Sequence, residues 1–147
     1  MNAETAPSTI PLIVADVFEL AGLFRGHGEA IAAALGQTQA RWQVMSAASG
    51  GALTVPQIAR RLGVTRQNVQ RIADLLVAEG AARFAGNPDH KGSPYLVLSN
   101  KGQSALADIN KSAGVYHAKL ARQLAGADLK SLHRNLRRLL EAAANSQ

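Results

Sequence analysis

Five polar side chains in the middle of the chain carry hydrogen-bonding groups that suit the edges of DNA bases. Arginine pairs with guanine through two hydrogen bonds, and glutamine or asparagine pairs with adenine in the same way in the major groove. A short helix that presents such side chains on one exposed face can bring them to base edges. The same residue types occur on any solvated helix, so the neighbouring elements must decide between the two interpretations. The five residues are Arg66, Gln67, Asn68, Gln70 and Arg71.

The residues before them predict a first short helix. Thr54 and Gln57 stand three apart ahead of an apolar run, which is the spacing of a capping box, so this helix should begin near Val55. Pro56 is tolerated in the opening turn, where its missing N–H would have no partner anyway. Gly63 suits the left-handed conformation that ends a helix. The expected buried side consists of Ile58, Ala59 and Leu62.

A second helix is expected after a three-residue turn at 63–65. Thr65 suits its N-cap, and Gly80 suits its end. Its apolar residues recur at steps of three and four, which places them on one buried face and leaves the five polar residues outside. The pair of helices therefore predicts a helix-turn-helix. The expected buried residues are Val69, Ile72, Ala73 and Leu76.

Two short strands are expected after this motif, at 82–85 and 95–98, and a minimal strand at 52–54. The loop between the two longer strands is rich in glycine, proline and other turn formers, so we expect a flexible hairpin, the wing of a winged helix. His90 and Lys91 lie at its tip. A compact ammonium on a mobile loop suits phosphate oxygens better than base patterns.

Long helical patterns flank the motif. The pattern over residues 10–35 has an apolar arc too wide for one small partner, and the helix expected after Asp128 has a leucine stripe formed by Leu129, Leu132, Leu136 and Leu139. Both ends are therefore expected to form a dimer interface. Gly26-His27-Gly28 interrupts the first pattern and predicts a bend or a close approach there.

Charge and length are consistent with this organisation. The chain has 147 residues, 47% of them apolar, which suits one small domain with dimerising extensions. Its net charge of +6 favours an anionic partner, although charge alone does not separate DNA from RNA or a membrane surface. Residues 1–54 have two basic and four acidic side chains, whereas residues 55–101 have seven and three. The positive charge thus begins where the motif begins.

Several functional classes have no support in the sequence. The absence of cysteine excludes disulfides and thiolate chemistry, and the four histidines lack the spacing of metal ligands, so we expect no metal and no cofactor. Neither a phosphate-binding loop nor a nucleophile elbow is present, so we expect no enzyme. The first eleven residues lack the basic region of a secretory signal, and no apolar run is long enough to span a membrane. We expect a cytoplasmic protein.

The order and spacing of these residues resemble the MarR family of bacterial winged-helix transcriptional regulators. The likeness covers roughly residues 37–102 well and the flanking helices by pattern only. The family's wing sequence Asp-Arg-Arg stands here as Asp89-His90-Lys91, which favours a phosphate clamp over a groove reader. The matching segments are Trp42-x-Val44, Leu53-Thr54-Val55-x-x-Ile58-Ala59-x-x-Leu62-Gly63-Val64, Val69-x-Arg71-Ile72-x-x-Leu76-x-x-x-Gly80, Arg83, Asn87-x-Asp89 and Leu98-Ser99-x-x-Gly102.

The resemblance implies a homodimer with interlocking terminal helices, which binds a pseudo-palindromic operator in double-stranded DNA. It implies that residues 65–71, from Thr65 onward, enter the major groove and that the wing, with Arg83, His90 and Lys91, contacts the minor groove or the backbone. It also implies a repressor released by a small organic effector, often aromatic or phenolic, in a pocket between the dimer helices and the winged helix. The candidate effector residues are His27, Arg41, Trp42 and Met45, although for Trp42 and Met45 plain core packing is the favoured interpretation.

The sequence therefore predicts a mainly α fold with a small β-hairpin, a winged helix-turn-helix with N- and C-terminal dimerisation helices. The expected domains are 1–36 for dimerisation, 37–99 for DNA binding and 100–147 for dimerisation. The alternative is a winged-helix protein-interaction module without specific DNA binding. The two differ in salt dependence, because a protein that neutralises several phosphates loses affinity steeply as salt rises.

Overall fold

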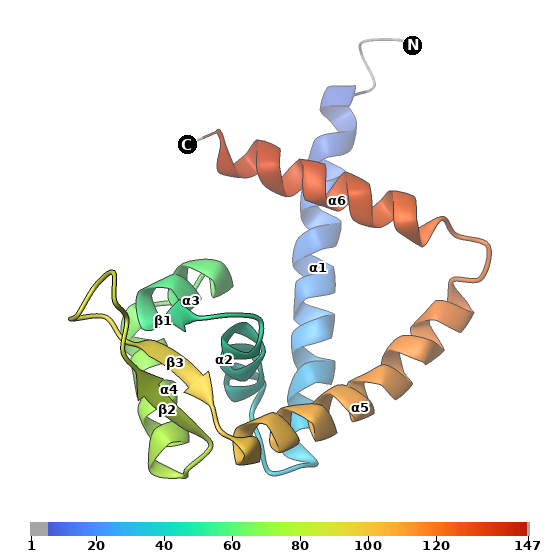
Figure 1. The fold of residues 1–147 in the computed structure, drawn as a ribbon. Coiled ribbons are helices and arrows are strands. Elements are labelled where there is room, and N and C mark those ends of the chain that lie inside the picture. Colours follow the sequence, from blue (N-terminus) through green and yellow to red (C-terminus); the bar gives the residue numbers. More distant parts are fainter. Residues whose placement is uncertain (1–5, 147) are drawn as a thin grey trace. The chain divides into compact units, whose positions relative to one another are not determined.

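The computed structural model describes residues 6–146 and is mainly helical, as the sequence predicted (Figure 1). By backbone contacts the chain divides into two compact units, the first ending at Ala113 and the second beginning at Gly114. The elements in chain order are α1 (Ala6–Ala33), α2 (Gln39–Ser49), β1 (Leu53–Thr54), α3 (Val55–Leu62), α4 (Arg66–Ala78), β2 (Ala82–Ala85), β3 (Tyr95–Leu98), α5 (Asn100–Gln123) and α6 (Leu129–Ala144).

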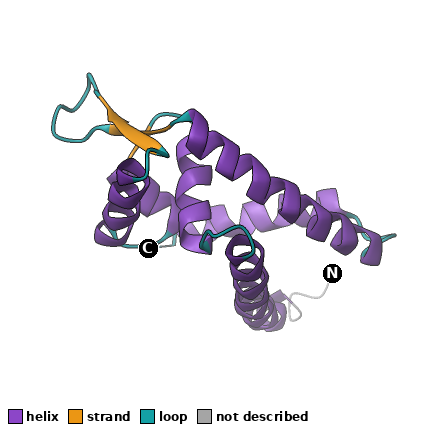
Figure 2. Ribbon diagram, turned by 90° about the horizontal axis from the view of Figure 1, so that it is seen from below, coloured by secondary structure: helices purple, strands orange, loops and turns teal. Residues whose placement is uncertain are grey.

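The three strands form a small antiparallel sheet in the order β1-β3-β2. Figure 2 shows strands in orange. Leu96 in β3 pairs with Leu53 on one side and with Phe84 on the other. Leu96 and Leu98 are buried, whereas Tyr95 and Val97, which alternate with them along the strand, are only half-buried, as the two faces of a strand require. The strand boundaries predicted at 82–85 and 95–98 are confirmed. A third strand thus ties the start of the motif to the hairpin.

The helix ends of the motif follow the predicted capping chemistry. The side-chain oxygen of Gln57 accepts from the backbone N–H of Thr54 at 2.9 Å, and the Thr54 hydroxyl accepts from the Gln57 N–H at 3.3 Å. Gly63 leaves α3 with a φ of +67°, in the left-handed region that favours glycine. Thr65 then caps α4 by accepting from the Asn68 N–H at 3.1 Å. These local features fix where α3 begins and ends and where α4 begins.

One apolar core joins α2, α3, α4, the sheet and the first part of α5. The predicted inner residues of α4 are all buried, and Ile58 and Ala59 are buried in α3, whereas Leu62 is only half-buried. Packing along one whole face therefore fixes which side of α4 faces the core. The largest side chains with almost no exposed surface are Met45, Ile58, Leu76, Leu96, Ile109, Val44 and Val69.

Helix α1 continues through the Gly26-His27-Gly28 interruption to Ala33. Of the two predicted outcomes, a bend or a close approach, the close approach is observed at Gly28, which is buried. A Cβ at this position would lie 3.2 Å from Cγ of Gln39 in α2. The outer part of α1 is different, because the large apolar side chains between Ile10 and Phe24 are mostly exposed.

Within the second unit, Asp128 caps α6 by accepting from the Ser131 N–H at 2.9 Å. The sequence predicted Leu129, Leu132, Leu136 and Leu139 on an inner face. In the single chain Leu139 is half-buried and the other three are exposed. Helix α6 has no buried residue, so the predicted inner face is not covered within one copy. No helix within residues 6–146 has both the length and the apolar character needed to cross a bilayer.

Candidate nucleic-acid interface

Helix α4 presents a polar face opposite its buried side. Arg66, Gln67, Gln70 and Arg71 are exposed there, and Asn68 is half-buried. Because the apolar face is locked into the core, these side chains have a fixed common direction away from it. The structure thus brings the five candidate base readers onto one helix face.

Neighbours along the same helix hold two of these side chains. Nη2 of Arg71 donates to Oδ1 of Asn68 at 3.0 Å, and Nε2 of Gln70 donates to Oδ1 of Asp74 at 2.9 Å. Pairs three or four residues apart are the ones that meet on a helix surface. Asp74 was not among the predicted site residues, although its position four residues after Gln70 could have indicated it.

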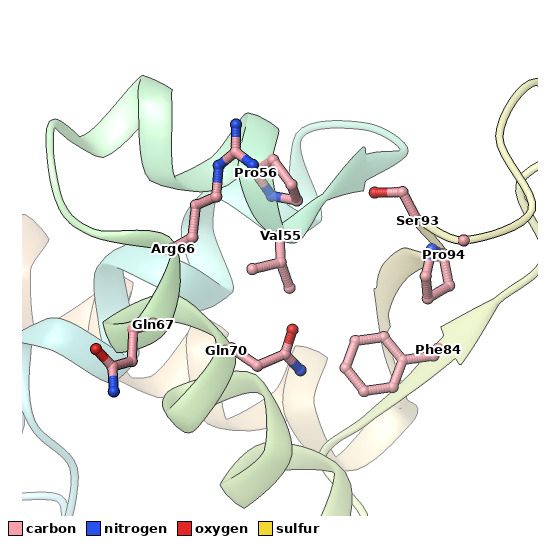
Figure 3. A pocket seen from close by; sticks show the side chains of 9 residues that line it. Val55, Pro56, Arg66, Gln67, Gln70, Phe84, Ser93 and Pro94 are labelled. Atoms are coloured by element: carbon pink, nitrogen blue, oxygen red, sulfur yellow. The ribbon is translucent and has the colours of Figure 1, made fainter.

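A hollow of about 340 Å³ separates the start of α4 from the hairpin between β2 and β3. Figure 3 shows its lining side chains, with Val55 from α3, Gln70 from α4 and Phe84 from β2 around the open space. A second hollow of about 570 Å³ shares Pro56, Arg66, Gly92 and Ser93 with the first, and it also has Arg60, Asp89 and His90 in its wall. The motif and the hairpin therefore enclose a groove to which the motif contributes Arg60 and Arg66 and the hairpin contributes Asp89 and His90.

Arg60 is a cationic residue of this groove that was absent from the predicted site. It is exposed on α3 and lines the larger hollow together with Arg66 and His90. Its position three residues after Gln57, on the solvent side of the first motif helix, was the available signal. The proximity of that helix to the hairpin tip could not be read from the sequence.

The hairpin tip has more internal structure than its glycine and proline content indicated. Nδ2 of Asn87 donates to the carbonyl of Ser93 at 3.0 Å, and Oδ1 of Asn87 accepts from the Asp89 N–H at 3.1 Å. Two backbone bonds, from His90 N–H to the Asn87 carbonyl and from Ser93 N–H to the His90 carbonyl, complete the turn. The loop that was expected to be mobile is thus held by hydrogen bonds from the Asn87 side chain. His90 and Lys91 are exposed at the tip, and Arg83 is exposed on β2.

Three of the four predicted effector residues lie on α2, and each has a defined environment. Arg41 donates through Nη1 to Glu79 at 3.0 Å and through Nε to Gln37 at 2.8 Å, and its Nη2 also pairs with Glu79. Nε1 of Trp42 donates to Oδ1 of Asn110 at 3.0 Å. Met45 is fully buried in the core. The fourth residue, His27, is exposed on α1 next to the close approach at Gly28.

The contact with Arg41 changes the acidity of its partner. The hydrogen bond from the guanidinium holds the pKa of Glu79 below its ordinary value of 4.5, and the charges of Arg41 and Lys101 act in the same direction against partial desolvation. Elsewhere, no three His, Cys, Asp or Glu residues within 6–146 gather into a group that could hold a metal ion.

Comparison with known proteins identifies relatives of this arrangement. Residues 35–91 match the family model described as MarR family. The uncharacterized protein Rv2011c of Mycobacterium tuberculosis is 53% identical over 133 residues, which are 90% of this chain and 93% of that protein. CouR from Rhodococcus jostii RHA1, solved with p-coumaroyl-CoA, has a TM-score of 0.75 at 15% identity and covers 92% of this chain and 93% of its own. MarR of Staphylococcus aureus, in complex with salicylate and kanamycin, has a TM-score of 0.79 at 9% identity, with 99% and 98% covered.

Proposed function

Because the chain belongs to the MarR family, we propose that it is a homodimeric, sequence-specific regulator of transcription that binds a pseudo-palindromic operator in double-stranded DNA. The protein represses transcription from that site and releases the DNA when a small organic effector binds. It acts in the cytoplasm and catalyses no reaction. The observation that carries this proposal is the polar face of α4, held by its buried opposite side and placed beside a groove lined by Arg60, Arg66 and His90.

The contacts with DNA divide into readers and clamps. Gln67, Asn68, Gln70 and Arg71 read bases, since they lie in the first two turns of a helix that can enter the major groove. Thr65 fixes the start of that helix as its cap. The clamp residues hold the phosphate backbone between the motif and the hairpin. Arg60, Arg66 and His90 line the groove, and Arg83 and Lys91 are exposed on β2 and at the hairpin tip.

Two helical regions support a dimer. Large apolar side chains are exposed along α1 from Ile10 to Phe24, and α6 has a leucine stripe without any buried residue. Apolar surface of this extent is rare on soluble monomers and marks an interaction surface. A second copy of the chain is the partner that a palindromic operator requires, because each copy supplies one α4 to one half-site.

A small organic effector is supported by two proteins of similar fold, one solved with p-coumaroyl-CoA and the other with salicylate and kanamycin. We propose an aromatic or phenolic effector that contacts Trp42, Arg41 and His27, with Met45 behind them in the core. Trp42 is the sole tryptophan of the chain, so its fluorescence reports binding directly. Quenching by phenolic acids, together with weaker operator binding, is the expected result. Quenching without any change in DNA affinity would reject the effector role.

Selection of bound fragments from random DNA, followed by fluorescence-anisotropy titration, tests the proposal. The selected sites should contain two half-sites centred about 10 base pairs apart, one turn of the double helix. Affinity for the selected duplex should exceed that for a scrambled duplex and should fall steeply as salt rises. Equal affinity for both duplexes, or affinity that does not change with salt, would instead indicate a protein-interaction module.

A further inference from the structure

The chain leaves the recognition helix α4 through three residues whose carbonyl groups are all held by the start of α5. Nζ of Lys101 donates to the carbonyl of Glu79 at 2.8 Å. The Ser99 hydroxyl donates to the carbonyl of Gly80 at 2.6 Å, and the Ser99 N–H donates to the carbonyl of Ala81 at 3.0 Å. These carbonyls belong to the segment that directly follows α4. The helix's own carbonyls at Leu75, Leu76 and Val77 already accept from the N–H groups of that segment, so the bonds from 99–101 hold the exit of the helix.

The backbone is closely packed at this junction. Gly102 is buried, and a Cβ at that position would lie 2.0 Å from the carbonyl oxygen of Ala81, a distance that no folded protein tolerates. The Gly102 N–H donates to the Ser99 hydroxyl at 3.2 Å. The Ser99 hydroxyl, which donates to the Gly80 carbonyl, is therefore itself fixed by a hydrogen bond. The backbone of α5 at Gly102 therefore contacts the backbone of Ala81, just after the end of α4.

The same point is fixed from α2. Both terminal nitrogens of Arg41 pair with the carboxylate of Glu79, the residue that caps α4 at its C-terminus. A guanidinium that binds a carboxylate through two bonds fixes direction as well as distance. Helices α2, α4 and α5 thus meet at Glu79, and each contributes a polar contact to the junction.

We propose that this junction, formed by Arg41, Glu79, Ser99, Lys101 and Gly102, sets the angle of the recognition helix and thereby determines which spacing of DNA half-sites the dimer accepts. The inference rests on the proposed function. Helix α5 continues beyond Ala113 into the second unit, whose exposed leucines support the dimer. In that dimer the junction is the place where the direction of each α4 is fixed relative to the helix that leads toward the partner copy.

DNA geometry makes such an angle measurable. One base pair advances the double helix by about 3.4 Å and turns it by about 35°. A rigid pair of recognition helices can therefore match only one spacing, and a change of one base pair should weaken binding about tenfold or more through lost base contacts. A junction that has lost its polar contacts lets α4 adjust, so it should tolerate a neighbouring spacing better.

The test uses the full-length chain with Ser99→Ala and Lys101→Met, separately and combined. A double variant with Ser104→Ala and Lys111→Met is the matched control, because both of its residues are exposed on α5 and it removes the same hydroxyl and the same charge. Each protein is titrated against the selected duplex and against duplexes with one base pair inserted or removed at the centre. Circular dichroism and light scattering verify fold and dimer mass.

We expect the wild type and the control to lose about tenfold or more with a changed spacing. In the combined variant that penalty should fall to about threefold or less, while affinity for the best spacing also falls. A combined variant that stays folded and dimeric but keeps the full penalty would overturn the inference, and so would a uniform loss at all spacings. If the combined variant does not fold, Lys101→Met alone replaces it, because this substitution removes one exposed contact. Its penalty for a changed spacing then supports or overturns the inference in the same way. A wild type without sequence preference would overturn the proposed function as well.

Discussion

Helices α4 and α6 have similar sequence patterns, but only α4 buries its apolar face within the single chain. Each begins at a polar cap, Thr65 in one and Asp128 in the other, and each repeats apolar residues at steps of three and four. Helix α4 buries four of its apolar residues, whereas α6 buries none. The same pattern is therefore satisfied inside the chain in the first case and left open in the second.

The difference teaches that amphipathic periodicity indicates which face of a helix is apolar but not what covers it. The outer part of α1 makes the same point, because Phe18 is 75% exposed there, while Ala32 near its inner end is fully buried. One portion of the molecule is thus complete in a single copy, and the other has apolar surface that a second copy could cover. Each prediction below tests one side of this contrast.

The largest effect is expected from charges placed on the open face of α6. Leu132→Asp combined with Leu136→Asp should raise the dimer dissociation constant about a thousandfold or more, since burying an unpaired charge costs several kcal/mol. Light scattering at micromolar concentration should then show a monomer. The control is Arg134→Asp with Arg138→Asp, which places the same side chains on the opposite face and should leave a dimer. An unchanged dimer in the leucine variant would show that this stripe is not an interface.

A core substitution in α4 should destabilise the fold without dissociating the dimer. Leu76 is fully buried, so Leu76→Ala should lower the free energy of unfolding by about 2–5 kcal/mol, through lost transfer energy and a residual cavity. Leu75, its neighbour on the same helix, is 43% exposed, and Leu75→Ala should cost less than half as much. Urea titration measures both. Equal losses would mean that the exposed position is also covered in the assembled protein.

Within the complete portion, reader and clamp residues should be separable. Arg71→Ala should cost about 1–3 kcal/mol on the selected duplex and relax preference at one or two positions, if its contact is a bidentate base pair. Lys91→Ala should weaken all duplexes alike and lower the salt slope by about one unit. Anisotropy titration against selected and scrambled duplexes at several salt concentrations distinguishes them. If Arg71→Ala lost the same affinity on both duplexes, that residue would be another clamp.

The smallest effect concerns the ion pair between Arg41 and Glu79. The pKa of Glu79 is lowered in the folded chain, so the pair stabilises the fold above pH 4.5, and this contribution disappears as the pH falls through the lowered value. The carboxylate side chain is 46% exposed, so its contribution should be at most about 1 kcal/mol. Glu79→Gln should therefore be less stable than the wild type in urea at about pH 6, and the difference should shrink as the pH is lowered progressively below 4.5. A difference that stays constant over this pH range would assign the effect to packing.

The parts of the fold that the sequence predicted are those governed by local chemistry. Thr54 and Gln57 form the capping box within four residues of chain, and Gly63 and Thr65 form the turn between the two helices. The strands at 82–85 and 95–98 also follow from short apolar runs around a loop of turn formers. Each of these signals lies within the element that it specifies, so no knowledge of distant partners was needed.

The contacts that escaped prediction join residues far apart in the chain. Arg41 and Glu79 are 38 positions apart, and Trp42 and Asn110 are 68 apart. Neither pair has a local pattern, because a surface arginine or asparagine has many possible partners until the fold places one beside it. Arg60 escaped for the same reason, since its role depends on the position of the hairpin. The sequence analysis therefore predicted the exposed polar face of α4 but not the distant contacts around it.

The bonds at the end of α4 are made to main-chain carbonyls, which every amino acid possesses. Ser99 and Lys101 would hold that end whatever side chains the exposed face of the helix carried. The attachment of α4 is thus independent of the side chains on its polar face. If that face reads DNA as proposed, exchanging only Arg66, Gln67, Asn68, Gln70 and Arg71 for the residues of another regulator, with Val69 and residues 79–102 kept, should change the sequence preference without rebuilding the scaffold.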